Sequence, residues 1–280
     1  MSCTSCGGAW KLKIYISCDM EGISGVVNWD DTGREGHEDY QRFRKLMTLE
    51  ASAAVEGAFA GGATEVVVND SHGGMRNIML EDFHKEARLI TGSSKFMSMM
   101  EGLDGSYDAA MFIGYHARAG ARGILSHTYT GQVLEYRVNG ELMGETGMNA
   151  LVAGAFGVPV IFLSGDSTVT AEAKRLIGDI QTVAVKEPAT RYAAKCLHPE
   201  KARELIKAGV QEALKSPWPR PLVASKPVTV SVKFSNSGQA DGASVLPHST
   251  REDDLTVSYT DDEYIICLRA ARTMMALAGR

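Results

Sequence analysis

Side chains that commonly bind metal ions follow three separate apolar segments of the chain. Asp19 and Glu21 come shortly after KIYIS, His72 follows EVVVNDS, and His116 follows AAMFIGY. In an open parallel sheet, the carboxyl ends of the strands line one crevice, and ligands bind there. If the three segments are strands of such a sheet, these side chains meet at one place. A metal site is therefore the leading hypothesis.

Asp19 and Glu21 are separated by one residue, and alternate residues of an extended strand point to the same side of it. Both carboxylates can therefore reach one cation while Met20 points away. Taken alone, this short pattern is more typical of a turn with two solvated acids. The next glycines, Gly22 and Gly25, lack the G-x-G-x-x-G spacing of a dinucleotide-binding loop, so a nicotinamide site is not supported.

Two histidines occupy the same kind of position. His72 in NDSHGG follows an apolar segment and stands among turn-forming residues. His116 in GYHARAG follows another apolar segment and precedes small residues that leave room for a substrate. A hydrogen-bonded loop histidine is the alternative interpretation for each. Because the arrangement occurs twice, we favour two metal ligands that face the crevice.

His127 in LSHTY is a third candidate, and its expected role is different. Imidazole titrates near neutral pH, which suits proton transfer or the stabilisation of an oxyanion. The remaining histidines stand in polar or helical segments and are expected at the surface; they are His37, His84, His198 and His248.

A further carboxylate is needed if the site is to hold two cations, and Glu141 and Glu145 are the candidates. Glu145 immediately precedes a helical pattern, where Gly144 and the first backbone amides of the helix can orient it. Glu141 stands beside Asn139-Gly140, a strong signal for a type I′ hairpin turn, and is expected in solvent. We therefore select Glu145.

The charges of the selected acids favour hydrolysis. Asp19, Glu21 and Glu145 together carry −3 against +4 for two divalent ions, which leaves about one positive charge to hold and acidify a bridging water. Such a water has its pKa lowered to about 7 and becomes a nucleophile at physiological pH. Mixed histidine and carboxylate ligands suit zinc, with manganese as the alternative.

Apolar, β-rich segments alternate with helical patterns in the first half of the chain, which is typical of βαβ units around a parallel sheet. A predicted hairpin over 133–144 interrupts the alternation as an inserted β-arm. The expected fold is therefore an α/β protein with a mostly parallel sheet flanked by helices. Strands are predicted at 11–17, 65–69, 109–115 and 158–163, and helices at 40–60 and 147–156.

The pattern changes after Asp166, so a second, smaller α/β domain is predicted at the C-terminus. Asp261 or Asp262 is expected to cap the final helix, which ends before Gly279. In this half, helices are predicted at 171–177 and 199–215, and strands at 182–186, 228–234 and 255–259. The predicted division is a flexible N-terminal extension over 1–10, a metal-binding catalytic domain over 11–165 and the smaller domain over 166–280.

The composition is that of a globular protein: of 280 residues, 44% are hydrophobic and 22% are charged. The net charge of −5 and the lack of a Lys/Arg run argue against a nucleic acid or an anionic membrane surface as partner. No apolar stretch reaches the ~18 residues of a membrane span and no signal peptide is recognised, so a cytoplasmic location is expected. Five cysteines, including the CxxC of Cys3 and Cys6, are expected as free thiols.

Several segments of the chain occur in the order typical of one family. SCDMEGISG, VNDSH, MEGL, GYHAR, SH and GE-x-G-x-N-A resemble the zinc D-aminopeptidases of the DppA type, which are associated with bacterial dipeptide uptake. The resemblance runs from about residue 11 to near the C-terminus. It implies a dinuclear zinc site in which Asp19 bridges the metals and His127 is the catalytic histidine. The implied ligands are the five residues already selected: Asp19, Glu21, His72, His116 and Glu145.

The resemblance also implies what the site does. It implies that an N-terminal D-amino acid, such as D-alanine, is released from short peptides, and that the chains form a ring-shaped homodecamer around the active sites. Our mechanistic hypothesis is that a metal-bridging hydroxide attacks the scissile carbonyl group, and that His127 stabilises the oxyanion or protonates the leaving amine. Lys186 and Asn149 are further candidates for the pocket wall, although a packing role suits each equally well.

Two other classes of protein remain as alternatives. A metallophosphoesterase also holds two metals on an α/β scaffold, but its D-x-H, G-D, G-N-H-D and late G-H-x-H segments do not occur here in that order. A non-catalytic peptide-binding component of a transport system would keep the metal ligands and would not need His127. Assays of hydrolysis separate these classes from a peptidase.

Overall fold

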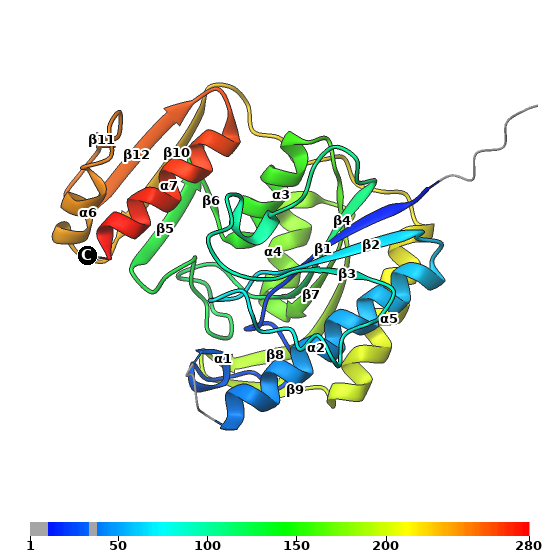
Figure 1. Cartoon of the computed structure of the whole chain (residues 1–280). Coiled ribbons are helices and arrows are strands. Elements are labelled where there is room, and N and C mark those ends of the chain that lie inside the picture. The colour runs from blue at the N-terminus through cyan, green and yellow to red at the C-terminus, as the bar shows by residue number, and fades with distance from the viewer. Residues whose placement is uncertain (1–10, 34–37, 280) are drawn as a thin grey trace, which may run out of the picture.

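Two β-sheets organise the computed structural model, which describes residues 11–33 and 38–279 (Figure 1). The first sheet carries the strand ends singled out in the sequence, and the second is built on the inserted hairpin. Cys3, Cys6 and His37, on which predictions were made, lie outside the described residues.

The first sheet is almost entirely parallel. Its strands are β1 (Lys13–Cys18), β2 (Glu65–Asp70), β3 (Arg88–Ile90), β4 (Ala109–Tyr115), β7 (Val160–Asp166), β8 (Gln181–Thr190) and β9 (Ala193–Cys196). They lie in the order β3-β2-β1-β4-β7-β8-β9, and only β9 pairs antiparallel with its neighbour. β4 is buried along its whole length, as expected for the interior of a parallel sheet with both faces covered.

Helices cover both faces of the first sheet. One face carries α2 (Glu38–Ala60) and α5 (Pro199–Lys215), and the other carries α3 (Glu145–Ala155) and α4 (Ser167–Ile177) (Figure 1). Alternate residues of β1 belong to the two hydrophobic cores, because successive side chains of a strand point to opposite faces. Ile14 and Ile16 pack on the side of α2, whereas Tyr15 packs on the side of α3.

The second sheet is antiparallel, in the order β11-β12-β10-β5-β6. It contains β5 (Val133–Val138), β6 (Glu141–Met143), β10 (Val228–Phe234), β11 (Thr250–Arg251) and β12 (Thr256–Asp261), with α6 (Ser237–Ala243) and α7 (Tyr264–Ala278) packed on it. β5 and β6 form the predicted hairpin. Asn139 and Gly140 between them have positive φ angles of 49° and 82°, as a type I′ turn requires.

Each of the two sheets contains strands from both sides of the predicted domain boundary at 165/166. β8, β9 and α5 follow that boundary and complete the first sheet with its helical layer, whereas β5 and β6 precede it and belong to the second sheet. The predicted units 11–165 and 166–280 are thus joined through both sheets. The predicted fold class, an α/β protein with a mostly parallel, helix-flanked sheet and an inserted hairpin, is confirmed.

The ends of the predicted elements shift in places, and the final helix shows the clearest difference. α7 begins at Tyr264 without a side-chain cap, so the predicted cap at Asp261 or Asp262 is wrong. Asp261 instead ends β12, and its carboxylate accepts a hydrogen bond from the backbone N–H of Glu263. The sequence pattern also missed β3, β9 and α6, because such short segments carry too little periodicity to be recognised.

Further predictions concern membranes, thiols and surface histidines. None of the described helices is long and apolar enough to cross a membrane. Three cysteines are present as free thiols in the described part of the chain: Cys18, Cys196 and Cys267. The described histidines that were expected at the surface are exposed or partly buried: His84, His198 and His248.

Candidate metal centre

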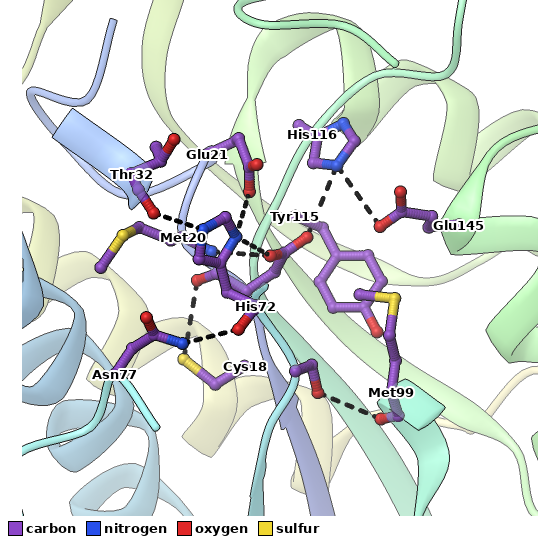
Figure 2. A network of polar contacts seen from close by, with 12 residues as sticks. Cys18, Met20, Glu21, Thr32, His72, Asn77, Met99, Tyr115, His116 and Glu145 are labelled. Carbon is purple, nitrogen blue, oxygen red and sulfur yellow. Dashed lines mark hydrogen bonds and ion pairs between the residues drawn. The ribbon is translucent and has the colours of Figure 1, made fainter. Parts of the chain in front are cut away.

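The carboxyl ends of three neighbouring strands bring the predicted side chains together. β1 lies between β2 and β4; Asp19 directly follows β1, His72 comes two residues after β2, and His116 directly follows β4. Glu21 lies in the turn after β1, and Glu145 is the first residue of α3. Figure 2 shows His72 close to Glu21, and His116 close to Glu145. All five predicted ligands are thus at one edge of the first sheet.

Asp19 lies between two groups of candidate ligands. Its Oδ1 is 3.2 Å from Nδ1 of His72, and its Oδ2 is 3.5 Å from Nε2 of His116. Glu21 completes the first group, with Oε2 3.0 Å from Nδ1 of His72. Glu145 completes the second group, with Oε2 3.4 Å from Nε2 of His116. Within each group the three ligand atoms lie within 4.8 Å of one another, close enough to contact one ion.

The rings of His72 and His116 are each held by a backbone carbonyl group. Nε2 of His72 donates to the carbonyl oxygen of Thr32 at 2.6 Å, in the short helix α1 (Asp30–Gly33) (Figure 2). Nδ1 of His116 donates to the carbonyl oxygen of Ala117 at 3.0 Å. Because a carbonyl oxygen only accepts, these nitrogens carry the ring protons. The other nitrogen of each ring faces the carboxylates, and it can ligate a metal ion once it has given up its proton.

Three of the converging atoms are buried and have no hydrogen-bond partner among the described residues: Asp19 Oδ2, Glu21 Oε2 and His116 Nε2. Leaving a buried polar atom without a partner costs about 1–3 kcal/mol. A divalent cation would satisfy carboxylate oxygens and an imidazole nitrogen at the same time, and zinc binds this mixture of donors in proteins. The residues present therefore fit a zinc site.

The electrostatics of the site favour positive charge next to the carboxylates. Burial, together with the charge of Glu21, raises the pKa of Asp19 to about 8. Burial alone lowers the pKa of His72, but the charge of Glu21 raises it well above its usual value. The pKa of His116 is raised in the same way, against the effect of burial, by the charge of Glu145. The buried acids thus attract protons, and cations compete with protons for the same atoms.

His127 lies beside both groups of ligands. Its Nδ1 donates to the carbonyl oxygen of Leu125 at 2.9 Å, which leaves Nε2 facing Oε1 of Glu21 and Oε1 of Glu145, each 3.9 Å away. Its ring stacks on that of His116, with centroids 4.2 Å apart. Burial and the charge of His116 lower the pKa of His127, so Nε2 can accept a proton at neutral pH. With Glu21 and His116 it also forms a third group of possible ligands.

Glu145 is oriented by a neighbouring loop, not by the backbone amides of its own helix as the sequence suggested. Its Oε1 accepts a hydrogen bond from the backbone N–H of Tyr129 at 2.7 Å. Glu141, the other candidate, is half-exposed and pairs with Arg175 at 2.7 Å. The structure thus places Glu145, and not Glu141, beside His116.

Lys186 supports the centre from outside the cavity, a role that the sequence did not distinguish from lining the pocket. Its side chain on β8 is buried, and burial lowers the pKa of Lys186 to about 8. Its ammonium group donates hydrogen bonds to three backbone carbonyl oxygens, at 2.5, 2.8 and 2.6 Å: those of Glu21, Ile23 and Val26. Lys186 therefore stabilises the turn that carries Glu21. Asn149 is fully buried and does not line the cavity either.

A cavity of about 270 Å³ opens onto these groups. Its wall includes most of the predicted site residues: Asp19, Glu21, His72, His127 and Glu145. Tyr129 and Arg272 also line it and were not predicted from the sequence. The position of Tyr129 two residues after His127 is a signal that could have found it. Arg272 belongs to α7 in the second sheet's layer, and no local pattern predicts that it reaches the cavity.

Buried carboxylates and histidines around a cavity, at the carboxyl edge of a parallel sheet, are typical of metal-dependent hydrolases. Residues 12–273 match the model of the Peptidase_M55 family, described as D-aminopeptidase. The D-aminopeptidase of Bacillus subtilis (strain 168) is 41% identical over 272 residues, which cover 96% of this chain and 98% of that protein. The chain therefore belongs to the D-aminopeptidase family.

A solved structure agrees with this assignment. The Zn-dependent D-aminopeptidase DppA from Bacillus subtilis, described as a self-compartmentalizing protease, matches with a TM-score of 0.94 and 39% sequence identity. The match covers 96% of this chain and 98% of that chain. The family resemblance and the fold class predicted from the sequence are confirmed. Membership of a peptidase family also argues against the phosphoesterase alternative.

Proposed function

We propose that this protein is a dinuclear zinc aminopeptidase that releases an N-terminal D-amino acid, such as D-alanine, from short peptides. The observation that carries the proposal is the position of Asp19, whose two carboxylate oxygens face two different groups of ligands. Membership of the D-aminopeptidase family and the names of the two relatives support the reaction and the metal.

The ligand assignment follows from the two groups. Asp19, Glu21 and His72 would hold one zinc ion, and Asp19, His116 and Glu145 would hold the other, so that Asp19 bridges them. Zinc suits these nitrogen and oxygen donors, and manganese is the alternative. Bound at this place, zinc supplies a Lewis acid for the scissile carbonyl group and a nucleophile near neutral pH.

The side chains of the cavity would carry out proton transfer and would bind the substrate. The carbonyl group of Leu125 holds the proton of His127 on Nδ1, so that Nε2 faces the cavity and can take up a proton and pass it to the leaving amine. In its protonated form the same nitrogen can stabilise an oxyanion on the scissile group. The free amine of the peptide would bind beside the metal ions or an acidic group of the cavity wall.

One experiment tests the proposal against its alternatives. Purified protein is analysed for metal content and assayed for release of D- or L-alanine from matched dipeptides, and of phosphate from a generic ester. We expect about two zinc ions per chain, release of D-alanine in preference to L-alanine, and no phosphate. Two metals without hydrolysis would favour a non-catalytic peptide-binding component, and phosphate release would favour a phosphoesterase.

We also propose that the chains assemble into a ring-shaped homodecamer that encloses the active sites. The description of the Bacillus subtilis relative as a self-compartmentalizing protease supports an assembly of this kind. Light scattering coupled to size-exclusion chromatography should then give a mass about ten times that of one chain. A monomeric or dimeric mass at working concentration would contradict the proposed ring.

A further inference from the structure

Arg272 is the one lysine or arginine side chain among the described residues that line the cavity of the metal centre. The acidic groups of that wall are the carboxylates of Asp19, Glu21 and Glu145. Arg272 comes from α7, the last helix of the chain, whereas the carboxylates follow β1 or begin α3. The cavity therefore joins an acidic wall from the first sheet to a basic group from the second sheet's layer.

The guanidinium group of Arg272 is anchored through one of its three nitrogens. Nη1 donates to the carbonyl oxygen of Phe96 at 3.1 Å and more weakly to that of Lys95 at 3.4 Å. Both bonds are made by Nη1, so they leave Nε and Nη2 of the guanidinium group available as donors. Nitrogens of one guanidinium group form a rigid fork of donors that matches the two oxygens of a carboxylate.

Tyr129 provides a second donor in the same wall. Its hydroxyl group is buried and has no hydrogen-bond partner within the described part of the chain. The residue has a φ of 60°, which is unusual for tyrosine, and its backbone N–H is held by Glu145. Tyr129 is thus fixed at one end by a candidate metal ligand.

The basic side chain in the cavity wall matches one end of a short, unblocked peptide by its charge. Such a peptide has a positive amine at one end and a negative carboxylate at the other. In the proposed enzyme Asp19, Glu21 and Glu145 are occupied as metal ligands, so Arg272 is the lysine or arginine side chain of the described cavity wall that remains to pair with a carboxylate. A volume of about 270 Å³ is slightly below the usual range for ligand pockets, which favours a substrate of very few residues.

We propose that Arg272, with the hydroxyl group of Tyr129, binds the C-terminal carboxylate of the substrate and so selects short peptides with a free C-terminus. This inference rests on the proposed aminopeptidase function and assigns its substrate class. Arg272 determines specificity in this account, and it takes no part in the metal centre.

The test compares D-alanyl-D-alanine with its C-terminal amide, using zinc-loaded wild type, Arg272→Met and Arg269→Met. Arg269 is a matched control one turn earlier on α7: it is exposed, lies over the ring of Phe96 at 3.7 Å and does not line the cavity. We expect Arg272→Met to lower kcat/KM for the free acid about 10- to 100-fold, mainly through KM, and to change hydrolysis of the amide little. Arg269→Met should behave like wild type with both substrates.

Tyr129→Phe should lower kcat/KM for the free acid more than for the amide, and all variants should keep the zinc content of wild type. Equal losses for acid and amide in Arg272→Met would show a structural role only and overturn the proposal. So would a wild-type enzyme that hydrolyses the amide as efficiently as the acid, although the proposed aminopeptidase function would then stand. If wild type releases no amino acid from either peptide, the proposed function itself fails, and the inference fails with it.

Discussion

The ammonium group of Lys186 donates a hydrogen bond to the backbone carbonyl oxygen of Glu21, with Nζ and the oxygen 2.5 Å apart. The two residues are far apart in sequence, on β8 and in the turn after β1. The same ammonium group also binds the carbonyl oxygens of Ile23 and Val26. The buried ammonium group of Lys186 therefore fixes the backbone that carries Glu21, which belongs to neither a helix nor a strand.

Replacing Lys186 with methionine should weaken both the fold and the metal centre. The substitution leaves three buried carbonyl groups without their donor, and we expect the free energy of unfolding to fall by about 2–5 kcal/mol. The affinity for zinc should fall as well, because the turn that carries Glu21 loses its support. Urea unfolding and zinc competition with a chelator measure the two effects.

Lys207→Met is the control for this substitution. Lys207 is a partly exposed residue of α5 that pairs with Glu56 at 2.9 Å, and surface pairs of this kind contribute about 0–1 kcal/mol. Zinc affinity in Lys207→Met should equal that of wild type. If the two lysine variants prove equally stable and bind zinc equally well, the assignment of Lys186 as a positioning residue is wrong.

Replacing His127 with alanine should separate catalysis from metal binding. We expect the variant to keep wild-type zinc content and to lose about 10²- to 10⁴-fold in kcat, because Nε2 of His127 is the proposed proton-transfer group of the cavity. His84→Ala removes an imidazole that packs on Phe59 and should keep full activity. Near-normal kcat in His127→Ala would exclude the catalytic role. Loss of zinc would instead make His127 a ligand in the group with Glu21 and His116.

The sequence could bring the candidate ligands to one place because each stands near a local signal. Asp19 and His116 stand directly after apolar strand segments and His72 stands two residues after one, and the rule that such ends meet at one edge of a parallel sheet needs no knowledge of the loops. Glu145 was found in the same way, at the start of a helical pattern. In this part of the fold, local pattern and tertiary position agree.

The supporting residues could not be predicted, since their roles arise from packing between distant segments. In the sequence, Lys186 is one charged residue of a strand, and its role depends on the turn after β1 packing against it. Arg272 reaches the cavity only because α7 packs beside the loop that contains Phe96. The hairpin of β5 and β6 was recognised from its turn, but its pairing with β10 was not, and the strand exchange between the sheets follows from that pairing.

The buried carboxyl group of Glu50 should make stability depend on pH. Burial raises its pKa to about 7, although the backbone N–H of Ser24 and the charge of Lys186 act in the opposite direction. Because the folded state then binds more protons than the unfolded state between about pH 4.5 and 7, stability should fall as the pH rises through this window and level off above it. Each unit of pKa difference corresponds to about 1.4 kcal/mol.

Comparison with Glu50→Gln isolates this contribution. The glutamine keeps an oxygen acceptor for the Ser24 N–H but has no charge, so its free energy of unfolding should lack this component. Urea unfolding of both proteins at pH 5 and pH 8, at one zinc concentration, should show wild type losing stability relative to the variant at the higher pH. Parallel behaviour of the two proteins would mean that Glu50 titrates at its usual value.

The zinc content of Asp19→Asn tests the central claim, a two-ion centre that shares one carboxylate, most directly. Elemental analysis should find about two zinc ions per chain in wild type and at most one in Asp19→Asn, which should also fail to release D-alanine from a dipeptide. Glu141→Gln, which removes a half-exposed charge in the hairpin of β5 and β6, should match wild type in both measurements. An Asp19→Asn protein that retains two zinc ions and full activity would contradict the account.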